Sequence, residues 1–530
     1  MQPPRVRDYV ALGVLIVGAF ATVLLVLPYR AFDLDRFFAP KELALHASAT
    51  VAGLLLLSGA RRISLSRADA ALATWIALSV AAALLATNHW LAYRALAISV
   101  SSVTAFWSAR RLAQAGLGDA LARALAAAVV IGSLTAVAQA YGLKMEVAAL
   151  NRAPGGTFGN RNFMAHLAAI GVPLLLFLVA TARTRLAAMA WTVSLAVCAG
   201  ALVLSRTRAA WLALALSGLI AFLVALRGPP VMDLPGAKRR IITAIGALFA
   251  GVLFALFLPN SLDWRSQNPY LESVVGVVNY RGGSGRGRLV QYENSAKMAL
   301  AHPLLGVGPG NWPVVYPRFA AADDPSLAEG TGMAANPWPS SDWVAALSER
   351  GVPAVLALVG AVVWLLGGAL AVRYDAVQST SSRLASATGA AVLCVAVLEG
   401  GFDAVLLLAA PALIVWALTG ALLPFRREVY AATFSRRGRL VAMLALGVFG
   451  AGVLLTSAGR IWAMRLYDAG TVAALENAAA RDPGSFRIRM RLAEAYSARN
   501  LCVKARSEAA VAHNLFPNAP APKRLLERCR

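Results

Sequence analysis

Thirteen long apolar runs constrain the fold of this chain more than any other feature. Each has about 18 or more residues, enough for a helix to cross a hydrocarbon core of about 30 Å. They lie near 9–28, 42–60, 69–87, 89–107, 119–141, 163–181, 187–205, 209–227, 241–258, 344–372, 384–402, 405–424 and 440–458. Only 14% of the 530 residues are charged, against about 25% in soluble domains. The sequence predicts an all-α polytopic membrane bundle of about 12 to 13 transmembrane helices.

Basic residues follow the turns between these runs. The chain has 50 Lys and Arg against 26 Asp and Glu, a net charge of +24. Basic turns follow every second run, at Arg61, Arg62, Arg67, Arg110, Arg111, Arg183, Arg185, Lys238, Arg239, Arg240, Arg426, Arg427, Arg436, Arg437 and Arg439. By the positive-inside rule, the N-terminus and these turns are cytoplasmic. Topology and contact with membrane lipids therefore explain the charge, and no nucleic-acid partner is expected.

Two segments interrupt the pattern of spans. Residues 259–341 form one long connection, rich in Gly, Pro and Asn, on the predicted outer side, and connections this long are usually functional or disordered. After the membrane domain, 1–458, a polar tail, 459–530, carries helical patterning. Asp482-Pro483 and Phe516-Pro517 repeat in it at the 34-residue period of tetratricopeptide helices. About two repeats are too few for independent stability, so the tail is expected to lean on the membrane domain or a protein partner.

The four cysteines divide between these two regions. Cys198 and Cys394 fall inside apolar runs and are interpreted as small apolar residues. Cys502 and Cys529 lie in the tail, on the predicted outer side, where oxidising conditions allow pairing. Sequence spacing does not define disulfide geometry, so paired and unpaired thiols both stay open.

Arg206, Thr207 and Arg208 separate two apolar runs with almost no loop between them. The span count places this turn on the outer side, where the positive-inside rule gives no reason for arginine. Guanidinium groups at a membrane surface need an anionic partner or a water-filled cavity, and their planar donor forks match phosphate oxygens. We predict that this turn binds the phosphate of a lipid. Snorkelling of both side chains to headgroups is the alternative.

A second pair of arginines follows a glycine-rich stretch, 281–285, in the long connection. Glycines let the backbone approach an anion and point N–H groups at it, so Arg286 and Arg288 are interpreted as anion ligands. A solvated basic loop is the alternative. Tyr292 opens a predicted amphipathic helix at 292–300.

Two helix starts on the outer side add candidate residues. Asn160 and Asn162 can cap the helix that follows them, and Arg161 adds a cation where a helix N-terminus already favours anions. Asp342, after Ser340, can cap the next helix and is also placed to accept a proton at the end of the long connection.

The remaining motifs are expected to be structural. Gly306-x-Gly308-x-Gly310 lacks the strand–turn–helix context of a nucleotide loop and is interpreted as a tight turn that packs the connection onto the bundle. The histidines are scattered, so neither a metal site nor a cofactor is predicted: His46, His89, His166, His302 and His513.

Taken in order, these motifs resemble the O-antigen ligase and polymerase-like family of membrane glycosyltransferases, of the GT-C class. The resemblance covers roughly 150–425, on residues 158–163, 205–212, Arg288 with Tyr292, 303–311, 340–351, and Phe402-Asp403 with Pro411. It implies a multi-pass protein of the bacterial inner membrane whose active face and tail are periplasmic. Tetratricopeptide tails also recur in bacterial members.

The resemblance implies transfer of a glycan from an undecaprenyl-diphosphate carrier to a hydroxyl of lipid A core or of another glycan repeat, without a metal and with inversion. Arg208 and Arg288 match the arginines that clamp the diphosphate and stabilise the leaving group. With Asp342 they are the candidate catalytic residues. The candidate substrate-binding residues are Arg206, Arg161, Arg286, Asn160, Tyr292 and Ser340.

The chain departs from the ligase pattern at one position. That pattern is a histidine, then Asn, Ser or Gln, then nine further residues and Gly. Here Ser340-Ser341 and Gly351 keep the spacing without the histidine, and serine is no general base near neutral pH. Three explanations stay open: Asp342 or a loop acid (Asp323, Asp324 or Glu329) takes the proton, the enzyme is a polymerase relying on arginines, or the chain is inactive. A transporter of the lipid-linked glycan, with Glu399 as its intramembrane group, and an inactive assembly factor are the alternative functions.

Overall fold

The computed structural model describes residues 3–144, 153–227, 236–264, 266–276, 283–375, 377–423 and 429–529. In these ranges thirteen helices coincide with the thirteen apolar runs: α1 Val6–Leu24, α2 Asp35–Ser58, α3 Arg67–Leu84, α4 His89–Gln114, α5 Gly118–Ala140, α6 Arg161–Thr181, α7 Arg185–Ser205, α8 Arg208–Arg227, α9 Ala237–Phe257, α13 Asp342–Arg373, α14 Thr380–Glu399, α15 Ala409–Leu422 and α16 Arg436–Ala469. By length and composition, ten described helices can cross a membrane. The other three are α15, with 14 residues, and the more polar α2 and α4. The prediction of an all-α polytopic fold is confirmed.

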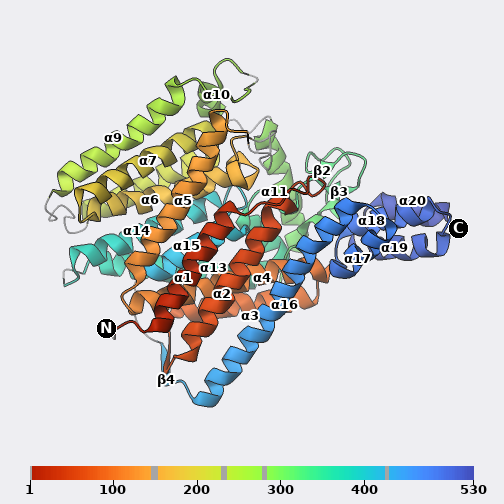
Figure 1. Cartoon of the computed structure of the whole chain (residues 1–530), viewed down its shortest axis with the longest axis horizontal. Helices are drawn as coiled ribbons and strands as arrows, with labels where there is room; N and C mark the ends of the chain where they lie inside the picture. Colours follow the sequence, from red (N-terminus) through yellow and green to blue (C-terminus); the bar gives the residue numbers. More distant parts are fainter. Residues whose placement is uncertain are drawn as a thin grey trace.

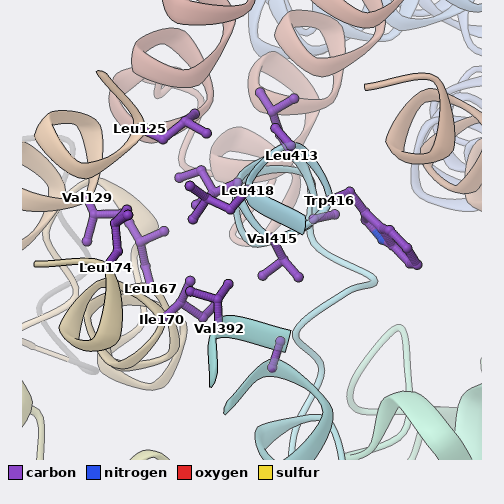
Figure 2. Close-up of a cluster of buried hydrophobic side chains, with 14 of the residues drawn as sticks. Leu125, Val129, Leu167, Ile170, Leu174, Val392, Leu413, Val415, Trp416 and Leu418 are labelled. Atoms are coloured by element: carbon purple, nitrogen blue, oxygen red, sulfur yellow. The ribbon is translucent and has the colours of Figure 1, made fainter. Parts of the chain in front are cut away.

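The short helix α15 lies at the centre of the bundle. It packs most extensively on α4, where Trp416 and Phe106 meet edge to face with ring centroids 5.8 Å apart. Figure 2 shows other α15 side chains near Leu125 of α5, Ile170 of α6 and Val392 of α14. Helix α15 is apolar on all sides because it is surrounded by other helices.

The thirteen helices alternate in direction, so their ends gather on two opposite faces (Figure 1). On one face the loop after α2 meets the segment before α16, because β1 (Arg62–Leu65) pairs antiparallel with β4 (Tyr430–Thr433). The other face carries the first turns of α6, α8 and α13 and the connection between α9 and α13. We call this second face the loop face.

The connection between α9 and α13 is largely folded. It contains α10 (Pro269–Val275), α11 (Gly283–Ala301), α12 (Trp312–Val315), a 3-10 turn η3 (Tyr316–Arg318) and a two-stranded ladder of β2 (Leu327–Ala328) with β3 (Met333–Ala334). The predicted helix start at Tyr292 is wrong, because α11 begins at Gly283. Arg286 and Arg288 therefore lie on a helix rather than in a glycine loop; residues 281–282 lie outside the described ranges.

Tertiary contacts explain why this glycine-rich segment is helical. Each glycine inside a helix costs about 1 kcal/mol relative to alanine. The Gln291 amide donates to Ser326 Oγ at 3.2 Å, and the Asn294 amide donates to Asp324 Oδ2 at 2.9 Å. These buried bonds fasten α11 to the residues around β2 and offset its weak propensity.

The Gly306–Gly310 segment forms the predicted tight turn. Gly306, Gly308 and Gly310 all have positive φ, between 63° and 96°, and a Cβ on Gly308 would lie 2.4 Å from Ala86 Cβ. The Glu349 carboxylate of α13 accepts hydrogen bonds from Gly310 N at 2.8 Å and Trp312 N at 3.2 Å. The turn thus packs the connection against α3 and α13.

The tail consists of α17 (Val472–Arg481), α18 (Phe486–Ser497), α19 (Cys502–Leu515) and α20 (Pro520–Arg528), beside the end of α16 (Figure 1). Helix α16 runs unbroken across the proposed boundary at residue 458. The hydrophobic core of the tail includes Phe32 and Ala39 of the membrane domain, so the tail leans on that domain. Cys502 and Cys529 are free thiols. The tetratricopeptide assignment stays a prediction.

Candidate functional site

The first turns of α6, α8 and α13 meet on the loop face, and α11 joins them through Arg288 and Tyr292. Thr207, just before α8, donates from Oγ1 to Asn162 Oδ1 of α6 at 3.3 Å. Asp342 N of α13 donates to the carbonyl of Gly400, after α14, at 2.8 Å. Helix N-termini carry unpaired N–H groups and the positive end of the helix dipole, so this convergence favours an anion.

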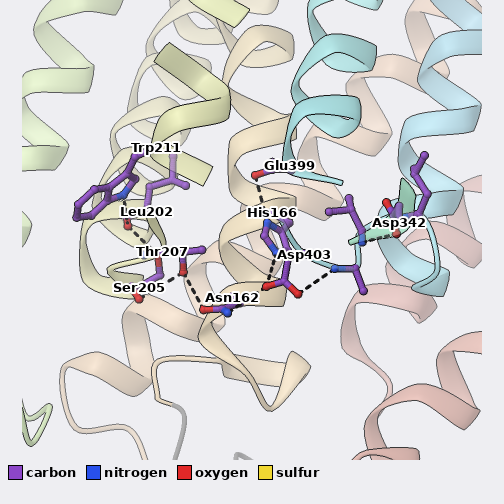
Figure 3. A network of polar contacts seen from close by, with 12 residues as sticks. Asn162, His166, Leu202, Ser205, Thr207, Trp211, Asp342, Glu399 and Asp403 are labelled. Carbon is purple, nitrogen blue, oxygen red and sulfur yellow. Dashed lines mark hydrogen bonds and ion pairs between the residues drawn. The ribbon is translucent and has the colours of Figure 1, made fainter. Parts of the chain in front are cut away.

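Asp403, in the turn between α14 and α15, connects these helices. Its Oδ2 accepts a hydrogen bond from Asn162 Nδ2 at 3.1 Å and lies 3.4 Å from His166 Nε2 and 3.9 Å from an Arg288 guanidinium nitrogen. Its Oδ1 accepts from Ala404 N at 2.9 Å. Figure 3 shows Asp403 between His166 and Asn162. Motifs more than 200 residues apart in the sequence therefore share one carboxylate.

His166 and Glu399 complete the network beneath Asp403. His166 Nδ1 lies 3.3 Å from Glu399 Oε1, and both side chains are fully buried. From the sequence, we gave His166 no role in the site, and we considered Glu399 only as the intramembrane group of a transporter. His166 lies four residues after Asn162, so the two share one face of α6, and this spacing could have indicated that His166 belongs to the site. Its acidic partners, however, lie on a distant segment of the chain.

Burial on its own would raise the pKa of Asp403. The positive charges on His166 and Arg288 outweigh that effect and hold the pKa of Asp403 below its ordinary value near 3.8. Asp403 is therefore ionised at neutral pH. Its side chain is 11% exposed and that of Arg288 is 25% exposed, so Asp403 is nearly buried and Arg288 is partly open to solvent.

Arg206 ends α7 in the left-handed conformation, with φ 55° and ψ 30°. This geometry costs a non-glycine residue about 1–2 kcal/mol, and such strain gathers at functional sites. Arg206 Nε donates to Ser273 Oγ of α10 at 2.8 Å, and its guanidinium centre lies 4.7 Å from the Trp264 ring centroid. The guanidinium centre of Arg161 lies 5.0 Å from that centroid, so these two cations are neighbours.

Arg208 occupies the first position of α8 and donates to the carbonyl oxygen of Gly276, after α10. A cation at a helix N-terminus opposes the helix dipole. Arg208 directly follows Thr207, which hydrogen-bonds to Asn162. Arg286 is exposed near the start of α11, and the structure brings only Arg288 to Asp403.

Other predicted substrate-binding residues are engaged in holding the site together. The Tyr292 hydroxyl lies 2.6 Å from the carbonyl oxygen of Ser340 and 3.2 Å from that of Gly401, two residues before Asp403. Ser340 N donates to Gln291 Oε1 at 2.6 Å. These contacts tie α11 to the turn that carries Asp403. Asn160 caps α6 as predicted, accepting from Asn162 N at 3.0 Å.

The carboxylate of Asp342 accepts hydrogen bonds from the backbone of the same turn. Val405 N donates to Oδ1 at 3.0 Å and Leu406 N to Oδ2 at 2.8 Å (Figure 3). Ser341, rather than Asp342 or Ser340, caps α13 through its hydroxyl. The geometry makes Asp342 an anchor of the turn and leaves Asp403 as the carboxylate beside Arg288.

The site combines several arginines, the N-termini of α6, α8 and α13, and one ionised carboxylate. Within the described ranges, no group of His, Cys, Asp or Glu has the arrangement of a metal site. No curated protein matches this chain. Residues 193–359, which run from α7 through the Arg206–Arg208 turn and α11 into α13, match the family model described as O-antigen ligase, and over this part the chain is similar to that family.

Proposed function

We propose that this protein is a GT-C-type membrane glycosyltransferase that moves a glycan from an undecaprenyl-diphosphate carrier to an acceptor hydroxyl. One observation carries the proposal. Thr207, between Arg206 and Arg208, is connected through Asn162 and Asp403 to Arg288. Hydrogen bonds and an ion pair thus join the Arg206–Arg208 turn and Arg288 to one ionised carboxylate, and we place the diphosphate of the carrier beside it.

Arg208 and Arg288 bind the diphosphate and stabilise the charge that grows on it as the glycosyl bond breaks. Arg206 and Arg161 add positive charge beside them. Asp403, rather than Asp342, accepts the proton of the acceptor hydroxyl while its oxygen bonds to the anomeric carbon from the side opposite the diphosphate. The product is an inverted glycosidic bond, and the diphosphate stays on the carrier. Carboxylates act as general bases in inverting glycosidases.

The loop face is periplasmic in this proposal, and the protein spans the bacterial inner membrane. Arginines on the opposite face, including Arg61, Arg110 and Arg439, follow the positive-inside rule. The acceptor is either lipid A core or another lipid-linked repeat. A transporter role fits less well, because Glu399 ends α14 beside the surface network instead of lying at mid-helix.

The test is transfer by purified protein supplied with an undecaprenyl-diphosphate-linked oligosaccharide, with and without lipid A core. We expect Arg208→Ala and Arg288→Ala each to lower the rate by about 100- to 1000-fold, the effect of losing one charge-stabilising donor. Lys297→Ala, on the exposed side of α11, is the control and keeps the full rate.

Core-linked product identifies a ligase, and longer glycans without added core identify a polymerase. If a product forms at the same rate with both arginine variants, the arginines do not carry the reaction. If the unaltered chain transfers glycan to neither acceptor, an inactive assembly factor becomes the better description.

A further inference from the structure

A cleft of about 1520 Å³ separates the helical tail from the loop face. Its walls come from the segment between α1 and α2, the start of α4, the residues after β3, the end of α16, and α18. We call it the tail cleft. The tail closes one side of it, so a function of the cleft would also explain why the tail docks here.

The tail cleft is rich in cations without carboxylate partners. Seven Lys and Arg and four Asp and Glu line it. Arg94 and Arg460 pair with acids, including Glu42. Within the described ranges Arg36, Arg487 and Arg491 have no carboxylate within ion-pair distance. Asp33 and Asp35 act on Arg36 and Arg487 only at longer range, and Arg491 donates to the Tyr467 carbonyl.

Arg36 is the most informative of these residues. It is 7% exposed, and its guanidinium lies 4.5 Å from the Phe37 ring centroid. Within the described part of the chain, its Nε and Nη1 atoms have no hydrogen-bond partner. A buried guanidinium with unused donors is costly, and an anionic group entering the cleft would offset that cost.

Aromatic rings supply flat surfaces in the same cleft. Trp90, which is 43% exposed, lies on one wall, and Phe486 and Phe516 pack edge to face on the tail side. Rings of this kind present an apolar face to the C–H face of a sugar, while guanidinium groups donate to its hydroxyl and acidic groups. The mixture suits an acidic carbohydrate better than an apolar ligand.

The inner end of the cleft approaches the candidate site. Phe38 and Trp338 line it, and their ring centroids lie 5.2 Å apart. Phe163 contacts both rings and directly follows Asn162, the residue that bonds to Asp403. These three rings therefore connect the inner end of the cleft with the first turn of α6, which carries Asn162.

We propose that the tail cleft binds an acidic oligosaccharide and holds the glycan whose hydroxyl is to be extended or linked. This inference rests on the proposed glycosyl transfer for its biological meaning. The binding site itself does not depend on that reaction. The same chemistry could come from the free acceptor or from the glycan already attached to the carrier.

The test is binding of a galacturonate hexamer and of a neutral glucose hexamer to the full-length protein in nanodiscs, by isothermal titration calorimetry. We expect the acidic hexamer to bind at least tenfold tighter. Arg487→Gln/Arg491→Gln should weaken it by tenfold or more, and Arg36→Gln and Trp90→Ala should also weaken it. Matched controls on α16, Arg465→Gln and Trp462→Ala, lie outside the cleft and should change nothing. Equal binding of both hexamers, or equal losses in the controls, would overturn the proposal.

Competition assigns the source of the ligand. If the cleft holds the free acceptor, acidic hexamer inhibits transfer competitively with the acceptor; if it holds the carrier-linked glycan, inhibition is competitive with the donor. Arg208→Ala separates the two proposals, because it should lower the transfer rate by about 100- to 1000-fold and leave hexamer binding unchanged. If the protein transfers glycan but does not bind the hexamer, only the proposed binding in the tail cleft is refuted. If it binds the hexamer but does not transfer glycan, only the proposed function is refuted.

Discussion

At the scale of single residues, the ionised Asp403 takes, in our proposal, the role that the histidine has in the ligase pattern. Asp403 has a pKa below its ordinary value near 3.8, so it stays charged as the pH falls from 8 to 5. We expect the transfer rate to stay level over that range, whereas a histidine base would lose activity below about pH 6.5. Because the pKa of Asp403 is lower in the folded protein than in the unfolded chain, its ionisation adds to the free energy of unfolding above pH 3.8. This contribution is lost as the pH falls through the pKa of the folded protein. A pH–rate profile that declines through pH 6 to 7 would contradict this assignment.

Two variants separate the roles of the two carboxylates. Asp403→Asn removes the proton acceptor and should lower the rate by about 100- to 10,000-fold. Asp342→Asn keeps one oxygen for the amides of Val405 and Leu406, so it should lower the rate less and leave the pH profile level. Steady-state rates from pH 5 to 8 for both variants check this, and a shifted profile for Asp342→Asn would make Asp342 the base.

At the scale of elements, α11 carries Arg288 and is held by Tyr292. Tyr292→Phe leaves the carbonyl oxygens of Ser340 and Gly401 without this donor, at a cost of about 1 kcal/mol. Because Arg288 then moves relative to Asp403, we expect about a tenfold lower rate with little loss of stability. The comparison is Tyr374→Phe, on an exposed residue at the far end of α13, with thermal unfolding measured alongside the rate. An unchanged rate in Tyr292→Phe would mean that α11 is held by its other contacts.

At the scale of the whole molecule, the tail and the membrane domain share one hydrophobic core. Phe32, 6% exposed, packs edge to face on Tyr467 at 4.9 Å between ring centroids. Phe32→Ala should destabilise this contact by about 3–5 kcal/mol and expose α17–α20 to protease, with the membrane bundle intact. Limited proteolysis followed by mass spectrometry checks the result. Val503→Ala, 86% exposed on the tail surface, should digest as the unaltered protein does, and equal digestion of Phe32→Ala would show that Phe32 does not hold the tail.

The pattern of apolar runs was sufficient to predict the membrane fold, because each helix satisfies its own backbone and its length is set by the bilayer. Local signals also predicted the Asn160 cap and the Gly306–Gly310 turn correctly, since both depend on nearby backbone conformation. The start of α11 was mispredicted, because contacts from Gln291 and Asn294 to a later segment override the low helix propensity of its glycines.

Only the tertiary structure brings Asn162, Thr207, Arg288 and Asp403 together and assigns their partners. His166 and Glu399 are 233 positions apart, so no local pattern indicates that they meet. The sequence also placed Asp342 among the catalytic candidates, while the fold directs its carboxylate to the backbone of the Asp403 turn. Helix length and capping depend on neighbouring residues, but the partner of a buried charge depends on which helices pack together.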